Sequence, residues 1–203
     1  MIPNELIHTL RRVARFYDQR KVGDVGALGF RRSSDLERLL ACIERMVDEQ
    51  YLVPQGSLFL DMGCADGRVN VLLSYLLKSS VGVELDEWTL DEYPPLLGQL
   101  RMRLEAEYLP LPPENIRLFQ GDAMDSGLHQ TIREETGIGI GDFDLFYTYL
   151  TMQEEFADLI IRKAKRGAIF MVYGLERILP RWDGMALLTE RPLEDILALY
   201  KKT

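Results

Sequence analysis

The stretch LFLDMGCADGR, residues 58–68, joins a short apolar run to a turn that contains two glycines. An unbroken apolar run of this length is typical of a strand buried on both faces of a parallel sheet. Gly63 and Gly67 let the backbone turn tightly and approach a ligand, and the start of the helix that follows offers free N–H groups. The spacing is not the G-x-G-x-x-G of dinucleotide sites, because Ala65 stands at the second glycine position. This turn therefore argues against an NAD-dependent oxidoreductase.

Strand and helix patterns alternate beyond this turn. They predict helices within residues 69–78, 96–108 and 153–165, and strands at residues 81–85, 115–122, 143–150 and 167–174. The last two apolar runs, residues 185–190 and 195–200, are too close together for a helical crossover and predict an antiparallel hairpin. The fold class is therefore α/β: a Rossmann-like, doubly wound, mostly parallel seven-strand sheet with a C-terminal antiparallel hairpin.

Two amphipathic helices are expected before the first strand, at residues 3–17 and 34–49, the second opened by a capping box from Ser34 to Glu37. A glycine-rich segment joins them. We therefore expect residues 1–50 to supply two helices and a lid over the site, and residues 51–203 to carry the sheet. An inert linker between two packed helices is the alternative to a lid.

Composition excludes several classes of protein. The 203 residues carry 24 basic and 32 acidic side chains, a net charge of −8, which disfavours a nucleic-acid backbone as an obligatory partner. Two cysteines and two histidines are too few for a structural zinc site, so no metal is expected, and a reduced, cytoplasmic protein fits best. No apolar run is long enough to predict a membrane span.

Acidic residues follow three of the predicted strands. Asp61 and Asp66 flank the first turn and suit a cationic ligand. Glu84 closes the second strand, where a carboxylate can accept both hydroxyls of a ribose. Asp122 follows the third strand and can accept from the exocyclic amine of adenine, while the N–H of Ala123 can donate to a ring nitrogen. Because parallel strands end at one edge of a sheet, the sequence predicts one nucleoside site.

Residues 58–68, 81–85 and 118–125 together resemble, in order and spacing, the first three motifs of the class I S-adenosylmethionine-dependent methyltransferases. The match spans about residues 58–174. It implies S-adenosylmethionine as cofactor and residues 51–203 as a methyltransferase domain. The residues that it implies as cofactor contacts are Asp61, Gly63, Cys64, Ala65, Asp66, Gly67, Glu84, Leu85, Asp122 and Ala123. Residues 66–76, with Trp88, are also faintly similar to seven-strand protein-lysine methyltransferases of the Dot1 type.

Methyl transfer is an in-line displacement that needs no metal, although a base can assist an amine or hydroxyl acceptor. Tyr147 and Tyr149 are the catalytic candidates, with Tyr17 and Asp18 behind them; simple packing on one face of the sheet is the alternative for the first two. The Asn-Pro-Pro-aromatic motif of planar-nitrogen methylation is missing. The acceptor therefore stays open among a protein lysine and a small-molecule amine or hydroxyl, and a non-catalytic nucleoside-binding or protein-interaction module remains the alternative function.

Overall fold

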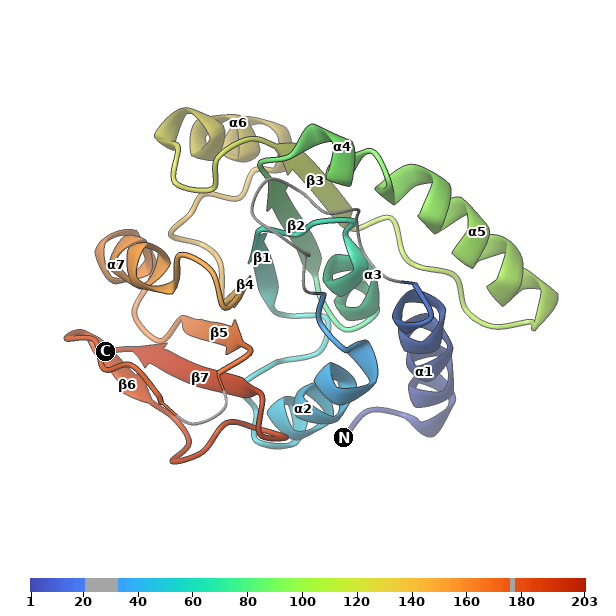
Figure 1. The fold of residues 1–203 in the computed structure, drawn as a ribbon, viewed down its shortest axis with the longest axis horizontal. Coiled ribbons are helices and arrows are strands. Elements are labelled where there is room, and N and C mark those ends of the chain that lie inside the picture. Colours follow the sequence, from blue (N-terminus) through green and yellow to red (C-terminus); the bar gives the residue numbers. More distant parts are fainter. Residues whose placement is uncertain (21–32, 176–177) are drawn as a thin grey trace.

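One sheet with helices on both faces forms the centre of the molecule (Figure 1). The computed structural model describes residues 1–20, 33–175 and 178–203. The strands are β1 (Leu58–Met62), β2 (Ser79–Glu84), β3 (Ile116–Gln120), β4 (Leu145–Tyr149), β5 (Ile169–Tyr173), β6 (Met185–Leu187) and β7 (Leu197–Lys202). The helices are α1 (Asn4–Asp18), α2 (Leu36–Asp48), α3 (Arg68–Ser74), α4 (Glu87–Leu90), α5 (Tyr93–Ala106), α6 (Ser126–Thr136) and α7 (Gln153–Lys163).

The strand order is β3-β2-β1-β4-β5-β7-β6, in a seven-stranded sheet. Strands β1 to β5 pair in parallel with one another, whereas β7 pairs antiparallel with both β5 and β6. The predicted sheet class and the C-terminal hairpin are therefore confirmed. The order reverses between β1 and β4, and such a switch point is where open α/β sheets bind their ligands.

The helices differ from the sequence expectation in several places. Helix α5 begins at Tyr93, before the predicted residue 96, because prolines suit the first turn of a helix and two follow directly. The polar stretch between β3 and β4 contains α6, and α4 is a further short helix after β2. The N-cap of α2 is Asp35, whose carboxylate accepts from the N–H of Arg38 at 2.9 Å, rather than the predicted Ser34.

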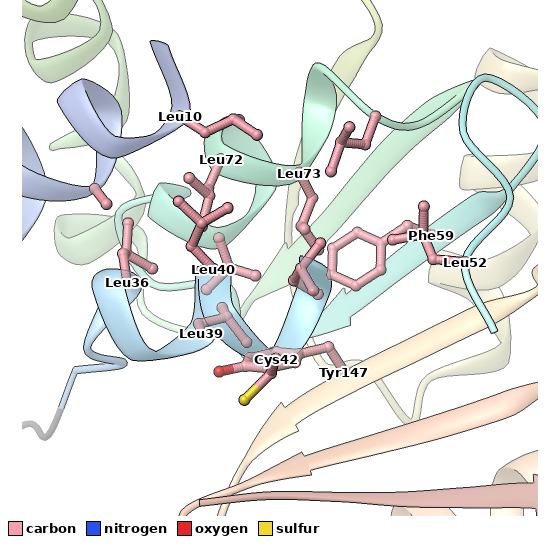
Figure 2. Packing of buried hydrophobic residues seen from close by; sticks show 14 of the residues in the cluster. Leu10, Leu36, Leu39, Leu40, Cys42, Leu52, Phe59, Leu72, Leu73 and Tyr147 are labelled. Carbon is pink, nitrogen blue, oxygen red and sulfur yellow. The ribbon is translucent and has the colours of Figure 1, made fainter. Parts of the chain in front are cut away.

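The apolar core has two halves, one on each face of the sheet. Helices α1, α2, α3 and α5 cover one face, and α7 packs its apolar side on the other, together with Ile132 of α6. Figure 2 shows part of the first half, in which leucines of α1, α2 and α3 pack in the same cluster as Phe59 of β1. The alternation along β4 follows from the two-residue period of a strand: Leu145 and Tyr147 face the first half and Phe146 faces the second.

Helices α1 and α2 belong to the same apolar cluster as β1 and α3. Leu10, Val13 and Ala14 of α1 and Leu39 and Ile43 of α2 are fully buried there. The carboxylate of Asp18 also joins the two helices, because it accepts from the N–H groups of Leu36 and Glu37 at 2.9 and 3.0 Å. The expected lid falls mainly on residues 21–32, outside the described residues, so it stays a prediction, as does the boundary near residue 50.

The turn after β1 packs very closely on β2. A Cβ atom placed on Gly82 of β2 would lie 2.6 Å from Leu118 Cδ2, 2.8 Å from Asn70 Oδ1 and 2.8 Å from Cys64 Cβ. These distances are shorter than any normal carbon contact, and two of the three partners sit in buried surroundings. Glycine at position 82 is therefore required by packing, although its backbone is ordinary strand.

We predict that Gly82→Ala lowers the free energy of unfolding by about 1–3 kcal/mol, because the added methyl group overpacks the turn. Gly98→Ala is the matched control, since Gly98 lies in α5 and a Cβ added there would meet no atom within 4 Å. Alanine at position 98 should raise the free energy of unfolding by about 0.5–1 kcal/mol, as expected inside a helix. Urea denaturation of both variants measures the difference, and equal stabilities would contradict the packing argument.

Candidate functional site

A cavity of about 730 Å³ lies at the carboxyl ends of β1, β2, β3 and β4. Its wall is formed by the turn after β1, the end of β2, the loops after β3 and β4, the start of α7 and the pair Ser33–Ser34 before α2. The volume suits a ligand of nucleoside size or somewhat larger. The cavity therefore lies at the switch point of the sheet, beside the three predicted motifs.

Most of the residues predicted to contact a cofactor line this cavity. They are Asp61, Gly63, Cys64, Ala65, Glu84, Leu85, Asp122 and Ala123. Asp66 and Gly67 are not part of the wall. A Cβ on Gly67 would lie 2.7 Å from Leu118 Cδ1 and 2.8 Å from Tyr93 Cδ2, so this glycine serves the packing of α3 on its neighbours.

Glu84 is fixed by the backbone of the two loops beside it. Its Oε2 accepts from the N–H of Ala65 at 2.9 Å and its Oε1 accepts from the N–H of Asp86 at 3.0 Å. Ala65 adopts a left-handed backbone with φ of 49°, which brings its N–H to the carboxylate. Each carboxylate oxygen has a further lone pair, so Glu84 can still accept from a ligand while it holds the turn.

Asp61 is a buried carboxylate whose Oδ1 has no hydrogen-bond partner. Burial raises the pKa of Asp61 well above its usual 3.8, and the nearby carboxylates of Glu84 and Asp66 raise it further. A buried acid without a partner is costly unless a cation or a donor meets it. Burial also raises the pKa of the neighbouring Cys64 thiol, so this cysteine is an unreactive packing residue.

Asp66 faces away from the cavity and pairs with Arg68. Both oxygens of its carboxylate accept from the guanidinium, from Nε and Nη2 at 2.9 Å each, and the two side chains are 0% and 4% exposed. The expectation that Asp61 and Asp66 face one ligand is therefore not met by the geometry. Arg68 itself lines the cavity, although it is not among the contacts predicted from the sequence; the only signal is a basic residue directly after the second glycine.

At the other end of the cavity, the loop after β3 is held by its own side chains. Asp122 is exposed, and its Oδ1 accepts from the N–H of Met124 at 2.8 Å. The carbonyl of Ala123 accepts from Nε2 of the buried His129 on α6, also at 2.8 Å. His129 is therefore a positioning residue for this loop, and nothing in the sequence indicates it.

Tyr147 lines the cavity, but its hydroxyl group is already engaged. It lies 2.5 Å from Oγ of Ser34, and the ring packs between Phe59 and Tyr173, with ring centroids 6.3 Å from each. Burial raises the pKa of Tyr147 well above its usual 10, so the hydroxyl stays protonated at neutral pH. This geometry favours a hydrogen-bonding and packing role over that of a base.

Of the other residues that the sequence analysis named, one lines the cavity and three do not. Tyr149 lines the cavity, and its ring packs on Tyr173 with centroids 5.4 Å apart. Tyr17 and Asp18 do not line it: Tyr17 is buried in the core and Asp18 holds the start of α2. Trp88 is 84% exposed and does not line it either.

The loop between β4 and α7 forms the rest of the wall. The hydroxyl group of Thr148 lies within hydrogen-bond distance of two carbonyl oxygens, that of Tyr149 at 2.9 Å and that of Met62 at 3.2 Å, and can donate its one proton to either of them. Leu150 and Met152 are partly exposed, at 41% and 44%. In the sequence, this region stands out only as the place where a substrate motif is missing. In the structure it supplies apolar and hydroxyl groups on the side of the cavity away from Glu84.

Two further findings concern the described part of the chain only. In it, no three histidine, cysteine, aspartate or glutamate side chains are grouped in a way that would hold a metal ion. No helix within residues 1–20, 33–175 and 178–203 has both the length and the apolar character needed to cross a membrane.

No protein-family model matches the chain, and no curated protein matches its sequence. Solved structures do share its fold. The rRNA methyltransferase aviRa from Streptomyces viridochromogenes has a TM-score of 0.57 and 15% identity, covering 87% of this chain and 88% of that one. Cofactor-bound Rv0187 from MTB has a TM-score of 0.53 and 14% identity, covering 99% and 90%.

A third structure is the RNA methyltransferase from Salinibacter ruber in complex with S-adenosyl-L-homocysteine. It has a TM-score of 0.51 and 14% identity, covering 79% of this chain and 89% of that one. At such low identities the likeness concerns the fold. The chain therefore shares the Rossmann-like fold of solved methyltransferase structures, which is the fold that its three motifs predict.

Proposed function

We propose that this protein is an S-adenosylmethionine-dependent methyltransferase. The observation that carries the proposal is the cavity wall, in which carboxylates from three successive parallel strand ends, Asp61, Glu84 and Asp122, lie together. One of them, Asp61, is buried with an unpartnered oxygen, which favours a ligand that carries positive charge. A positive charge or a hydrogen-bond donor on the ligand would satisfy that oxygen.

The residues of the wall fit the parts of this cofactor. Glu84 is fixed at the end of β2 with free lone pairs for the two ribose hydroxyls. Asp122, Ala123 and Asp61 line the same cavity. In this proposal Asp122 and the N–H of Ala123 bind the adenine, and Asp61 faces the positively charged end. When bound, S-adenosylmethionine supplies a methyl group on a positively charged sulfur. Two fold neighbours are described as bound to S-adenosyl-L-homocysteine or to a cofactor, which supports the same choice.

In this proposal the chain holds the acceptor and the cofactor in line and shields them from water. In-line displacement requires the acceptor atom to lie opposite the sulfur in a site from which water is excluded. Leu150, Met152 and Phe156 give the acceptor side of the wall an apolar surface. Tyr147 and Ser34 stay protonated there and can orient a polar acceptor by hydrogen bonding. We assign no base, since the acceptor decides whether one is needed.

Two observations bear on the acceptor. The neighbours aviRa and the Salinibacter ruber protein are RNA methyltransferases by description, whereas neither is described as acting on lysine. In this chain, however, three arginines of the N-terminal segment pair with its own glutamates, as Arg12–Glu107, Arg15–Glu37 and Arg20–Glu92. With a net charge of −8, we propose that the acceptor group is recognised inside the cavity rather than along a phosphate backbone.

The proposal is tested by binding and then by transfer. Calorimetry with S-adenosylhomocysteine, NAD and ATP should show binding of the first alone. Tritium-labelled methyl groups from S-adenosylmethionine should then enter one fraction of a cell lysate, with RNA, protein and small molecules assayed separately. Binding without transfer into any fraction would favour the non-catalytic alternative, and no binding of S-adenosylhomocysteine would overturn the proposal.

We predict that Glu84→Ala weakens the binding of S-adenosylhomocysteine by about 10- to 100-fold, because charge-assisted hydrogen bonds contribute about 1.5–3 kcal/mol. The affinity of Glu84→Gln for S-adenosylhomocysteine should lie between those of Glu84→Ala and the wild type, since an amide keeps one acceptor. Glu87→Ala is the control, because Glu87 is exposed on the neighbouring helix α4. An affinity of Glu84→Ala within twofold of the wild type would show that this acid only holds the turn.

A second prediction concerns Asp61. Its pKa is higher in the folded protein than in the unfolded chain, so its contribution to stability is present below pH 3.8 and is lost as the pH rises through the raised value. Asp61→Asn should therefore be more stable than the wild type near neutral pH when no ligand is present. The same variant should bind S-adenosylmethionine more weakly.

Urea denaturation of both proteins between about pH 4 and about pH 8 measures the effect. The stability difference between Asp61→Asn and the wild type should widen as the pH rises. A difference that is constant with pH would show that the buried carboxylate has a partner that keeps it ionised.

A further inference from the structure

The acceptor side of the cavity wall has no charged side chain within the described residues. It consists of residues 147–152, Phe156 and the pair Ser33–Ser34, all of which are apolar or carry a hydroxyl group. The charged residues of the described wall come from the ends of β1, β2 and β3 and the start of α3; they are Asp61, Arg68, Glu84, Asp86 and Asp122. A charged acceptor group would therefore lose its water here without gaining a partner of opposite charge.

Asp61 is the carboxylate that adjoins this side, since it is the register partner of Tyr147 on the neighbouring strand. It is buried, and its pKa is raised well above 3.8 by that burial. The proposed function already assigns Asp61 to the positively charged end of the cofactor. It is therefore not free to pair with an ammonium group of the acceptor.

The mouth of the cavity offers little to a phosphate backbone. In the described wall, the only basic side chain is Arg68, which is 4% exposed and paired with Asp66 through Nε and Nη2. The exposed residues of the wall include the acid Asp122 and the apolar Leu150 and Met152. Binding of a polynucleotide depends on basic side chains that neutralise phosphates. This wall therefore suits a free molecule better than a polynucleotide.

The hydroxyl groups of Ser34 and Tyr147 form a buried polar pair on the acceptor side. Their oxygens lie 2.5 Å apart, and the two residues are 6% and 2% exposed. Whichever hydroxyl donates in this bond, one proton of the pair is left over, and the described residues form no other hydrogen bond with either group. The pair can donate to a ligand, and its free lone pairs can accept from one. Such a pair recognises a neutral polar atom.

Tyr149 supplies an aromatic surface beside this pair. Of the three aromatic residues in the described wall, Tyr147 and Phe156 are buried, whereas Tyr149 is partly exposed. Its ring packs on that of Tyr173, with centroids 5.4 Å apart, and a Cβ atom on Gly174 would lie 3.7 Å from its Cε1. The ring is thus held from one side and keeps accessible surface, which suits packing against a second, flat ring.

We propose that the methyl acceptor is a small, uncharged aromatic molecule that is not part of a protein or a polynucleotide. Its ring packs on Tyr149, and a polar atom that it carries bonds to the Ser34–Tyr147 pair. This inference rests on the proposed function, since it names the substrate class of the same cavity.

A neutral acceptor is also consistent with the charges that the transfer moves. A lone pair of the acceptor forms the new bond to the methyl carbon while the bond from that carbon to sulfur breaks. The electron pair of the broken bond stays on the sulfur, which becomes neutral, and the positive charge passes to the acceptor atom. If this atom carries a proton, the proton leaves to water. The acceptor side therefore needs no charged side chain.

The first test compares probes of similar size that differ in charge. Benzyl alcohol, benzylamine and benzoate are neutral, positive and negative at neutral pH, and each is titrated by NMR against the full chain saturated with S-adenosylhomocysteine. Benzyl alcohol should bind about 10-fold more tightly than either charged probe, or tighter still, because a charge without a partner is costly to bury. Equal affinities, or no binding of benzyl alcohol, would overturn the inference.

The second test concerns the aromatic ring. Benzyl alcohol should bind about 2- to 10-fold more tightly than cyclohexylmethanol, its saturated counterpart, because aromatic pairs gain energy beyond their buried area. Tyr149→Leu should abolish this preference and Tyr149→Phe should keep it. Tyr108→Leu is the matched control, since Tyr108 is 96% exposed and does not line the cavity. Binding of S-adenosylhomocysteine shows that each variant is folded.

Equal affinities of the two alcohols in the wild type would overturn the inference without any substitution. A preference that persists in Tyr149→Leu would overturn the packing on Tyr149. Transfer of labelled methyl groups in a lysate gives the last test: the label should enter a small molecule that absorbs ultraviolet light. Label in RNA or protein instead would overturn the inference and leave the proposed function standing. Absence of S-adenosylhomocysteine binding in the wild type would overturn the proposed function, and the inference with it.

Discussion

The close contact between the turn after β1 and the end of β2 is the constraint on which the site depends. The N–H groups of Gly63 and Cys64 both donate to the carbonyl of Val83, at 2.9 Å each, and the N–H of Ala65 donates to the carboxylate of Glu84. The turn after β1 can approach β2 so closely only because position 82 has no side chain. As a result, two acids that are 23 positions apart in the sequence, Asp61 and Glu84, face one cavity.

This part of the site was predictable from the sequence for a simple reason. Apolar strand patterns fix which residues end each strand, and parallel strands end at one edge, so the grouping of Asp61, Glu84 and Asp122 follows without coordinates. Short polar helices are harder to predict from the sequence, because helices such as α4 and α6 have little apolar periodicity. A tertiary contact also explains why the N-cap of α2 is Asp35 and not the predicted Ser34: the Ser34 hydroxyl bonds to Tyr147.

What the sequence could not predict depends on the direction of single side chains. Ser34 and Tyr147 are 113 positions apart, and no local pattern joins them. Asp66 and Arg68 are only two positions apart, yet a sequence does not tell whether a carboxylate in a turn faces a ligand or its neighbour. The tyrosine that looked like a candidate base is a hydroxyl partner of the N-terminal segment, because the ring of Tyr147 faces the half of the core that α2 covers (Figure 2).

The cavity keeps a buried acid at a cost to the ligand-free fold. The unpartnered oxygen of Asp61 costs about 1–3 kcal/mol relative to a satisfied group. An apolar residue at this position would make the ligand-free fold more stable, but it would offer nothing to a donor or a positive charge on a ligand. Since a ligand that satisfies this acid binds only the folded state, its binding stabilises the fold in proportion to the logarithm of its concentration once the site is largely occupied. The proposed function therefore connects the cost of the buried acid with its use, beside a turn that packs closely on β2.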